Sequence, residues 1–295
     1  MERLIFQHLK NCKNMRYLLD TNVFYHLANP SIEFNSNYLP LDWFCDLFVS
    51  PLSVSELLCS EKTLESRANA AYELTRVLGI EILKPVNSVL AEHYGINTRN
   101  VKEDNLKNML NTFIYVLGKR IGNRIYLNEL LKDVCYKHKE AGIFMCNTSY
   151  SVKEKLLQYF GKNLDGKLSK DEIGHMLKDI NVFTMFNNIF IKRLKVVCSI
   201  DVSNCKELPT TLYPYANAQL MYTINLLMQG TKPKKTDWID IEHFLYCNLY
   251  VDKIYTNDTS WFKMLKQHKE FHNLSDYIEK PSFRKHEFLA FKEEN

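Results

Sequence analysis

Four acidic residues stand where an α/β fold would gather side chains for catalysis. Each lies near the end of a short apolar run or the start of a segment with helical spacing, and they are Asp20, Glu56, Asp240 and Asp258. The carboxyl ends of parallel strands open into one crevice, so these carboxylates are expected to converge there. Four acids in one crevice repel one another unless a cation joins them. The pattern therefore predicts a Mg²⁺ or Mn²⁺ site and chemistry on phosphate groups.

Each acid also has a purely local interpretation. Asp20 could cap the helix that follows it, and Glu56 could favour a helix N-terminus through the helix dipole. Asp258 could close an Asx-turn at the end of its strand. Asp237 and Asp240 have the spacing of a capping box, and we expect Asp237 to be the cap and Asp240 the ligand. These local roles explain the acids singly but not their joint pattern.

Short polar side chains flank two of the acids. They are Thr21, Asn22, Thr256 and Asn257. Such side chains could orient a carboxylate or contact a phosphate, and local turn capping is the alternative. His243 follows Asp240 by three residues, so it could border the site, although a lone histidine is more often structural.

The segments around the acids predict alternating strands and helices. Short apolar runs typical of buried parallel strands occur at residues 15–19, 47–49, 80–83 and 253–256. Helical spacing predicts helices over residues 21–28, 66–78 and 240–250. A further helix is expected to start at Ser53 or Ser55 and to carry Glu56 in its first turn.

Residues 97–235 have a different pattern, in which apolar residues recur at helical spacing and strand signals are few. One such stripe is Met221, Ile224, Leu227 and Met228. We predict a helical insertion here, between an N-terminal part of the α/β domain (1–96) and a C-terminal part (236–295). Because the insertion separates two halves of the site, we expect it to shape substrate access or to bind a protein partner or inhibitor.

Composition sets wider bounds on the function. The 295 residues are 46% hydrophobic, and 38 basic residues against 34 acidic ones leave a net charge of +4. This mild basicity permits a polyanionic partner, although a solvated basic surface would look the same. Lys232, Lys234 and Lys235 come just before Asp237, where they are placed to contact a phosphate backbone.

The eight cysteines contain no C-x-x-C pair, which argues against zinc knuckles and a disulfide framework. Free thiols in a reducing cytoplasm are the expected state. No apolar run approaches the roughly 20 residues that span a bilayer, so no membrane partner is expected.

The ordered acids and their settings resemble the PIN nuclease family. The matching motifs are Asp20-Thr21-Asn22 after the first strand, Glu56 in a Ser/Pro-containing turn after the second, Asp240 at a helix start, and Thr256-Asn257-Asp258 after the last. The resemblance covers roughly residues 15–95 and 236–275. The 184-residue separation of Glu56 and Asp240 departs from the family, and the helical block accounts for it as an insertion.

The resemblance implies a three-layer α/β/α fold with a central parallel sheet. It also implies a metal-dependent endoribonuclease that leaves a 5′-phosphate and a 3′-hydroxyl. Asp20 would be the central ligand, because it leaves the middle strand, and Asp240 and Asp258 would complete the site. Glu56 would orient the attacking water or help to bind the ion.

Three alternatives stay open at the level of the sequence. The first is a DNA-directed or structure-specific nuclease on the same scaffold. The second is a catalytically weak module that binds nucleic acid or protein. The third is a toxin or defence nuclease that a partner holds in check. Association with a second copy of the chain is open as well.

Overall fold

A five-stranded, all-parallel sheet forms the centre of the computed structural model, which describes residues 15–27, 46–76, 81–98, 124–178, 181–234 and 237–279. The strands are β1 (Arg16–Leu19), β2 (Asp46–Val49), β3 (Glu81–Ile82), β4 (Lys253–Tyr255) and β5 (Ile278–Glu279). Their order across the sheet is β3-β2-β1-β4-β5. The first strand is therefore the central one, as its expected role in the site requires.

The register of β1 brings three loops to one point. Leu19 pairs with Val49 on one side and with Tyr255 on the other. The strand order reverses at β1, and in open α/β sheets ligands bind at this switch point, beyond the carboxyl ends of the strands. The residues that follow the three strands, Asp20, Ser50 and Thr256, consequently start at neighbouring positions on this edge.

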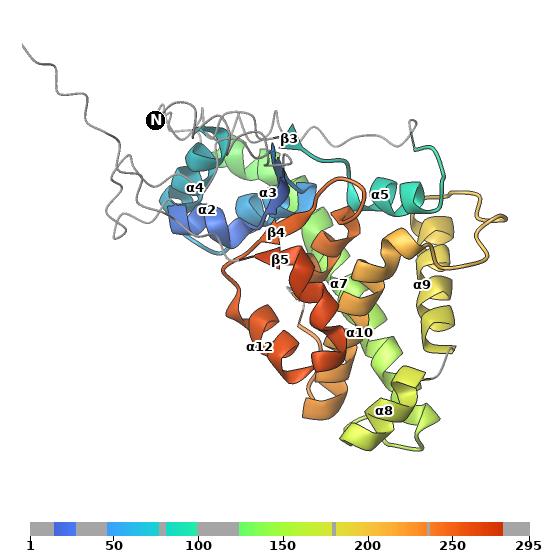
Figure 1. Cartoon of the computed structure of the whole chain (residues 1–295). Helices are drawn as coiled ribbons and strands as arrows, with labels where there is room; N and C mark the ends of the chain where they lie inside the picture. The colour runs from blue at the N-terminus through green and yellow to red at the C-terminus, as the bar shows by residue number, and fades with distance from the viewer. Residues whose placement is uncertain are drawn as a thin grey trace, which may run out of the picture.

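Helices cover both faces of the sheet, which gives the predicted three layers (Figure 1). Successive strand residues point to opposite faces. Leu19 packs in an apolar cluster with residues of α2 (Thr21–Leu27), α3 (Pro51–Cys59) and α4 (Leu64–Arg76). Leu18 and Ile254 belong to the other cluster, with residues of α5 (Val86–His93).

The helical block consists of long helices between α5 and the last part of the sheet. They are α7 (Arg124–Tyr159), α8 (Lys170–Lys178), α9 (Asn181–Val197) and α10 (Tyr213–Gln229), with the short 3-10 turn η1 (Thr210–Leu212) before α10. No strand interrupts residues 124–178 or 181–234, as the apolar spacing predicts.

The helical block shares its apolar core with the sheet. Ile224 and Leu227 of α10 are fully buried in the same cluster as Leu18 and Ile254. The first part of α7 packs against α3, and the helix then continues past α10 (Figure 1). The block therefore supplies much of the layer that covers one face of the sheet.

Besides α4, which begins at Leu64 rather than at residue 66, two helices differ from the sequence-based boundaries. The helix after β2 begins at Pro51, and its cap is Ser50, whose Oγ accepts a hydrogen bond from the Ser53 N–H at 3.0 Å. Proline suits the first helical position because it has no N–H to leave unpaired and its φ is already helical. Neither Ser53 nor Ser55 is the cap, and Glu56 lies in the second turn, beyond the strongest effect of the dipole.

The predicted helix over residues 240–250 is also shifted. It is observed as α11 (Asp237–Glu242), which tightens into the 3-10 turn η2 (His243–Tyr246). Cys247 then takes an extended conformation and Asn248 a left-handed one, with φ at 67°. This turn brings the chain into β4. After β4 follow α12 (Thr259–Gln267) and the 3-10 segment η3 (Lys269–Tyr277).

Some sequence predictions fall outside the described residues. These are residues 99–123 and 179–180 of the predicted helical insertion, residues 1–14, 28–45 and 280–295 of the predicted flanking parts, the helix ends at residues 28 and 77–78, the strand start at residue 80, and Lys235. All six cysteines of the described ranges are free thiols. No described helix is both long enough and apolar enough to cross a membrane.

Candidate metal centre

Asp20, Asp240 and His243 form a compact cluster at the switch point of the sheet. Each offers one ligand atom, and these atoms all lie within 4.8 Å of one another. Asp20 follows β1 directly. Asp240 and His243 come from α11 and the turn after it, and their three-residue spacing puts both on one face. The end of the central strand and the continuous segment α11–η2 thus supply the whole cluster.

The cluster lines a small cavity of about 10 Å³. Its other walls are Thr256 and the apolar side chains of Phe244, Ile254, Trp261 and Ile278. This volume is close to the minimum that accommodates one water-sized sphere. The cavity therefore suits a single small ion or a single water rather than an organic cofactor.

Hydrogen bonds fix the orientation of the buried Asp20 carboxylate. Its Oδ1 accepts from the Thr21 N–H at 2.6 Å, and its Oδ2 accepts from the Thr256 hydroxyl at 2.7 Å and from the Asn22 amide. The Asn22 amide also reaches Thr256 Oγ1 at 3.0 Å, while its oxygen accepts from the Asn257 N–H at 2.9 Å. The four flanking polar residues thus join β1 to β4 around Asp20.

His243 is buried and tied to the loop after β2. Its Nε2 lies 3.0 Å from the hydroxyl oxygens of both Ser50 and Ser53. Burial lowers the pKa of His243, against the opposing effect of nearby Asp20 and Glu242. A neutral ring that donates from Nε2 to a serine keeps the lone pair of Nδ1 for a cation, which is a common arrangement of metal-binding histidines.

The charged form of Asp240 is strongly disfavoured by its surroundings. Burial raises its pKa well above the usual range, and the charges of Asp20, Asp258 and Glu56 raise it further. In the described part of the chain, no donor group forms a hydrogen bond with its carboxylate. A half-buried carboxylate in this setting needs either a proton or a cation.

Glu56 lies near the cluster without joining it. Burial raises its pKa to about 7, the charge of Asp20 also raises it, and hydrogen bonding by Thr21 lowers it. Its ligand oxygens are not among the atoms that lie within 4.8 Å of one another. Direct ligation by Glu56 stays a prediction, but its charge is coupled to the site.

Asp258 and Asp237 are engaged in local contacts. Asp258 is the N-cap of α12, where its Oδ1 accepts from the Ser260 N–H at 2.8 Å. Its charge raises the pKa of Asp240, yet its oxygens are outside the compact cluster, so its role as a ligand stays a prediction. Asp237 is the first residue of α11, and its Oδ2 accepts from the Tyr222 hydroxyl at 2.6 Å.

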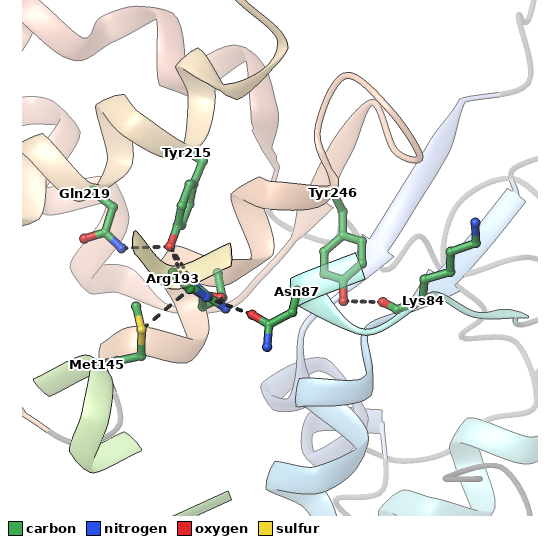
Figure 2. A network of polar contacts seen from close by, with 8 residues as sticks. Lys84, Asn87, Met145, Arg193, Tyr215, Gln219 and Tyr246 are labelled. Carbon is green, nitrogen blue, oxygen red and sulfur yellow. Dashed lines mark hydrogen bonds and ion pairs between the residues drawn. The ribbon is translucent and has the colours of Figure 1, made fainter. Parts of the chain in front are cut away.

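A buried ion pair holds α11, the helix that carries Asp240, and Figure 2 shows its arginine, Arg193, beside Asn87 and Tyr215. Glu242, two residues after Asp240, is completely buried and binds both terminal nitrogens of Arg193, at 2.8 and 2.7 Å. The Tyr215 hydroxyl donates to the same carboxylate, and the Arg193 Nε donates to Asn87 at 2.8 Å. Residues of α5, α9 and α10 therefore set the position of α11.

The comparisons with known proteins give no relative for this chain. No protein family, curated protein or solved structure matches it significantly.

The donor set of the cluster fits a divalent cation. Two carboxylates supply charge, and one imidazole supplies a borderline nitrogen donor. Mg²⁺ strongly prefers oxygen ligands, whereas Mn²⁺ and other transition metals accept a histidine as well. The sequence pointed to His243 only by its spacing from Asp240, and its inclusion shifts the expected preference from Mg²⁺ towards Mn²⁺.

In the metal-free protein, Glu56 and Asp240 should contribute less to stability as the pH rises from about 5 to 8, because the folded protein retains protons on them that the unfolded chain has released. His93, His138 and His243, whose pKa values are lowered by burial, act in the opposite direction, so the comparison of wild type with Asp240→Asn isolates the carboxylate. In Asp240→Asn the free energy of unfolding should fall less between pH 5 and 8 than in the wild type. Its Tm at pH 8 should be higher by several degrees, on the order of 2–4 °C for each kcal/mol gained in the free energy of unfolding. Thermal unfolding in the presence of a chelator, at pH 5 and pH 8, measures the difference.

Added Mn²⁺ should reverse that trend in the wild type, because its ligands bind in their deprotonated form. The rise in Tm should be larger at pH 8 than at pH 5 and should be lost in Asp240→Asn. Asp165→Asn, in an exposed turn, is the matched control and should behave like the wild type. An equal Mn²⁺ effect on wild type and Asp240→Asn would exclude Asp240 as a ligand.

Breaking the buried ion pair should disturb both stability and the metal centre. Arg193→Met leaves the Glu242 charge buried and unpaired, which should cost about 3–5 kcal/mol in urea unfolding. Adding Glu242→Gln should recover most of this loss while keeping an acceptor for Tyr215. Lys137→Gln removes an exposed ion pair with Asp133 and should cost at most about 1 kcal/mol.

The double variant Arg193→Met/Glu242→Gln separates the effect of the ion pair on the position of α11 from its effect on stability. Because α11 loses its fixed anchor, the double variant should bind Mn²⁺ more weakly than the wild type in a calorimetric titration. Unchanged Mn²⁺ affinity would show that the ion pair stabilises the fold without positioning Asp240 and His243.

Proposed function

We propose that this protein is a metal-dependent nuclease of the PIN-like type that hydrolyses RNA phosphodiester bonds. The observation that carries the proposal is the meeting of Asp20, Asp240 and His243 in one small cavity at the switch point of a parallel sheet. The order of the acids along the chain and their positions after β1, at α11 and after β4 support it further.

A cation held by these three residues would supply Lewis acidity at a phosphoryl oxygen and would lower the pKa of a nearby water. The chain's own groups complete the chemistry. Glu56, with a pKa raised to about 7, is suited to take a proton from the attacking water near neutral pH. Thr21, Asn22 and Thr256 hold Asp20 in one orientation, so little reorganisation is needed on binding.

Two features support a phosphate-containing substrate. The side-chain nitrogen of Asn257 is buried next to the site and has no hydrogen-bond partner in the described part of the chain. A phosphate oxygen brought to the cavity would give this donor an acceptor. Lys232 and Lys234 are exposed just before α11, where two positive charges would attract a nucleic-acid backbone.

The other functions make different demands on the same site. A DNA-directed or structure-specific nuclease would use the identical chemistry and would differ only in substrate. A module that binds nucleic acid or protein without catalysis has no need of an unpaired carboxylate such as Asp240. We further propose an intracellular setting, which the free thiols of the described cysteines favour. A toxin or defence role and a partner for the helical block are compatible with the same activity.

Purified protein should cleave RNA in the presence of Mn²⁺, and cleavage should disappear with a chelator. Asp20→Asn should abolish cleavage, because the central charged ligand is lost. Thr256→Val should reduce the rate by about 10–100-fold, the usual effect of removing a hydrogen bond to a metal ligand. Rates are measured on end-labelled single-stranded RNA, an RNA hairpin and DNA of the same sequence.

Asp165→Asn, prepared in the same way, serves as the control and should retain full activity. Faster cleavage of DNA than of RNA would support the alternative substrate. Absence of Mn²⁺- or Mg²⁺-dependent cleavage on all substrates, with binding retained, would support the non-catalytic module and contradict the proposal.

Lys232→Gln/Lys234→Gln should weaken RNA binding equally for different sequences. Each lost phosphate contact lowers the slope of log K against log salt by about 0.7 on a single strand, so a total change of about 1.4 is expected. Binding is measured by fluorescence anisotropy at several salt concentrations in the inactive Asp20→Asn background. Lys170→Gln/Lys178→Gln removes two exposed charges from α8 instead and should leave the slope unchanged.

A further inference from the structure

A second, larger cavity lies within the helical block, apart from the metal centre. Its volume is about 300 Å³, at the lower end of the range for small-molecule sites. Residues of α7, α9 and α10 line it, and none of its lining residues belongs to the cluster of Asp20, Asp240 and His243. The proposed nuclease chemistry gives it no role.

The walls of this cavity are aromatic and aliphatic. Phe186 and Phe190 of α9 and Tyr215 of α10 form a continuous aromatic side, with 4.9 Å between the ring centres of Phe190 and Tyr215. At the rim, Phe144 is 46% exposed and Val196 is 65% exposed. The three inner rings are only 1–2% exposed, so a flat aromatic group would remove the rim surfaces of Phe144 and Val196 from water and could stack on the Phe144 ring.

The charges of the cavity have one sign. Its lining contains Lys155, Lys192 and Arg193 and no acidic residue. Lys155 and Lys192 are exposed, and neither forms an ion pair with an acid of the described residues. Two free ammonium groups beside an aromatic wall complement a ligand with an anionic group at one end.

The inner wall of the cavity is rigid. Arg193 is held by its ion pair with Glu242, and Gln219 donates to the Tyr215 hydroxyl at 3.2 Å. Polar groups that are already paired do not need an acceptor from a ligand. The selective polar contacts are therefore those at the rim, from Lys155 and Lys192.

We propose that this cavity is a binding site for a small aromatic anion. The aromatic body would lie against Phe144, Ile189 and Val196, in front of the buried aromatic wall, and a sulfonate, carboxylate or phosphate would pair with Lys155 and Lys192. One wall of the site is Arg193, which also anchors α11 through Glu242. The binding site itself does not depend on the nuclease proposal.

A matched pair of fluorescent probes tests the proposal. The anion 8-anilinonaphthalene-1-sulfonate and its uncharged counterpart N-phenyl-1-naphthylamine share the aromatic body and differ in the sulfonate. Titrations use the full chain and follow probe fluorescence. Lys155→Gln/Lys192→Gln should weaken the anionic probe by about three- to tenfold and leave the neutral probe unchanged.

Two further variants define the site. Lys170→Gln/Lys178→Gln removes two exposed charges from α8 and should leave both affinities unchanged. Ile189→Trp, which fills part of the cavity, should weaken both probes. Thermal unfolding of each variant confirms that it is folded, and the surface lysine variants keep the test valid where Ile189→Trp does not fold.

The proposal predicts saturable binding of the anionic probe and a selective loss in the Lys155/Lys192 variant. If the Lys155/Lys192 variant and the Lys170/Lys178 variant weakened the binding of the anionic probe equally, the effect would be one of general surface charge. That result would overturn the proposal. Stronger binding of the neutral probe than of the anionic probe would also overturn the proposal, and so would a dimer in solution whose dissociation exposes the cavity. Either result would assign the walls of the cavity to an apolar partner instead.

Discussion

The buried ion pair between Arg193 and Glu242 joins the helical block to α11, and the candidate metal centre depends on both. Desolvation of two charges is costly, and a bidentate pair with further hydrogen bonds compensates for much of that cost without guaranteeing a net gain in stability. The structural consequence is a defined position: Glu242 cannot move far without leaving one charge unpaired inside the protein. Asp240 and His243 lie on either side of Glu242 in the sequence, so their position relative to β1 follows from a contact with the helical block.

The metal centre depends on a different balance. Asp20 is compensated by three hydrogen-bond donors, whereas Asp240 has neither a donor in the described chain nor an opposite charge within the cluster. The protein thus keeps one satisfied and one unsatisfied carboxylate beside a neutral imidazole. An arrangement that destabilises the metal-free protein near neutral pH is also the one that binds a cation most strongly, because the ion replaces the missing partner.

The helical block cannot be regarded as a separate unit attached to the sheet. Its α10 completes the apolar layer over Leu18 and Ile254, its α9 supplies the arginine that anchors α11, and its α7 packs against the helix that carries Glu56. The same three helices enclose the second cavity. The helical block is the segment that departs from the resemblance to PIN nucleases. It nevertheless helps to position the metal centre, and it also forms the surface on which a ligand or partner would act.

The sequence alone determined the parallel α/β fold, the central position of β1, the helical nature of the long middle segment and the placement of Asp20 and Asp240 at one edge. The alternation of strands and helices and the helical middle segment follow from short-range periodicity, and the gathering of the acids at one edge follows from the geometry of parallel strands. The central position of β1 is what the resemblance to PIN nucleases implies. Tertiary structure decided the rest. His243 became the third member of the cluster, and Asp258 became the cap of α12, because the choice depends on how α11 turns into η2 and packs. The pairing of Arg193 with Glu242, 49 residues further along the chain, depends on packing between distant helices, which no local pattern records.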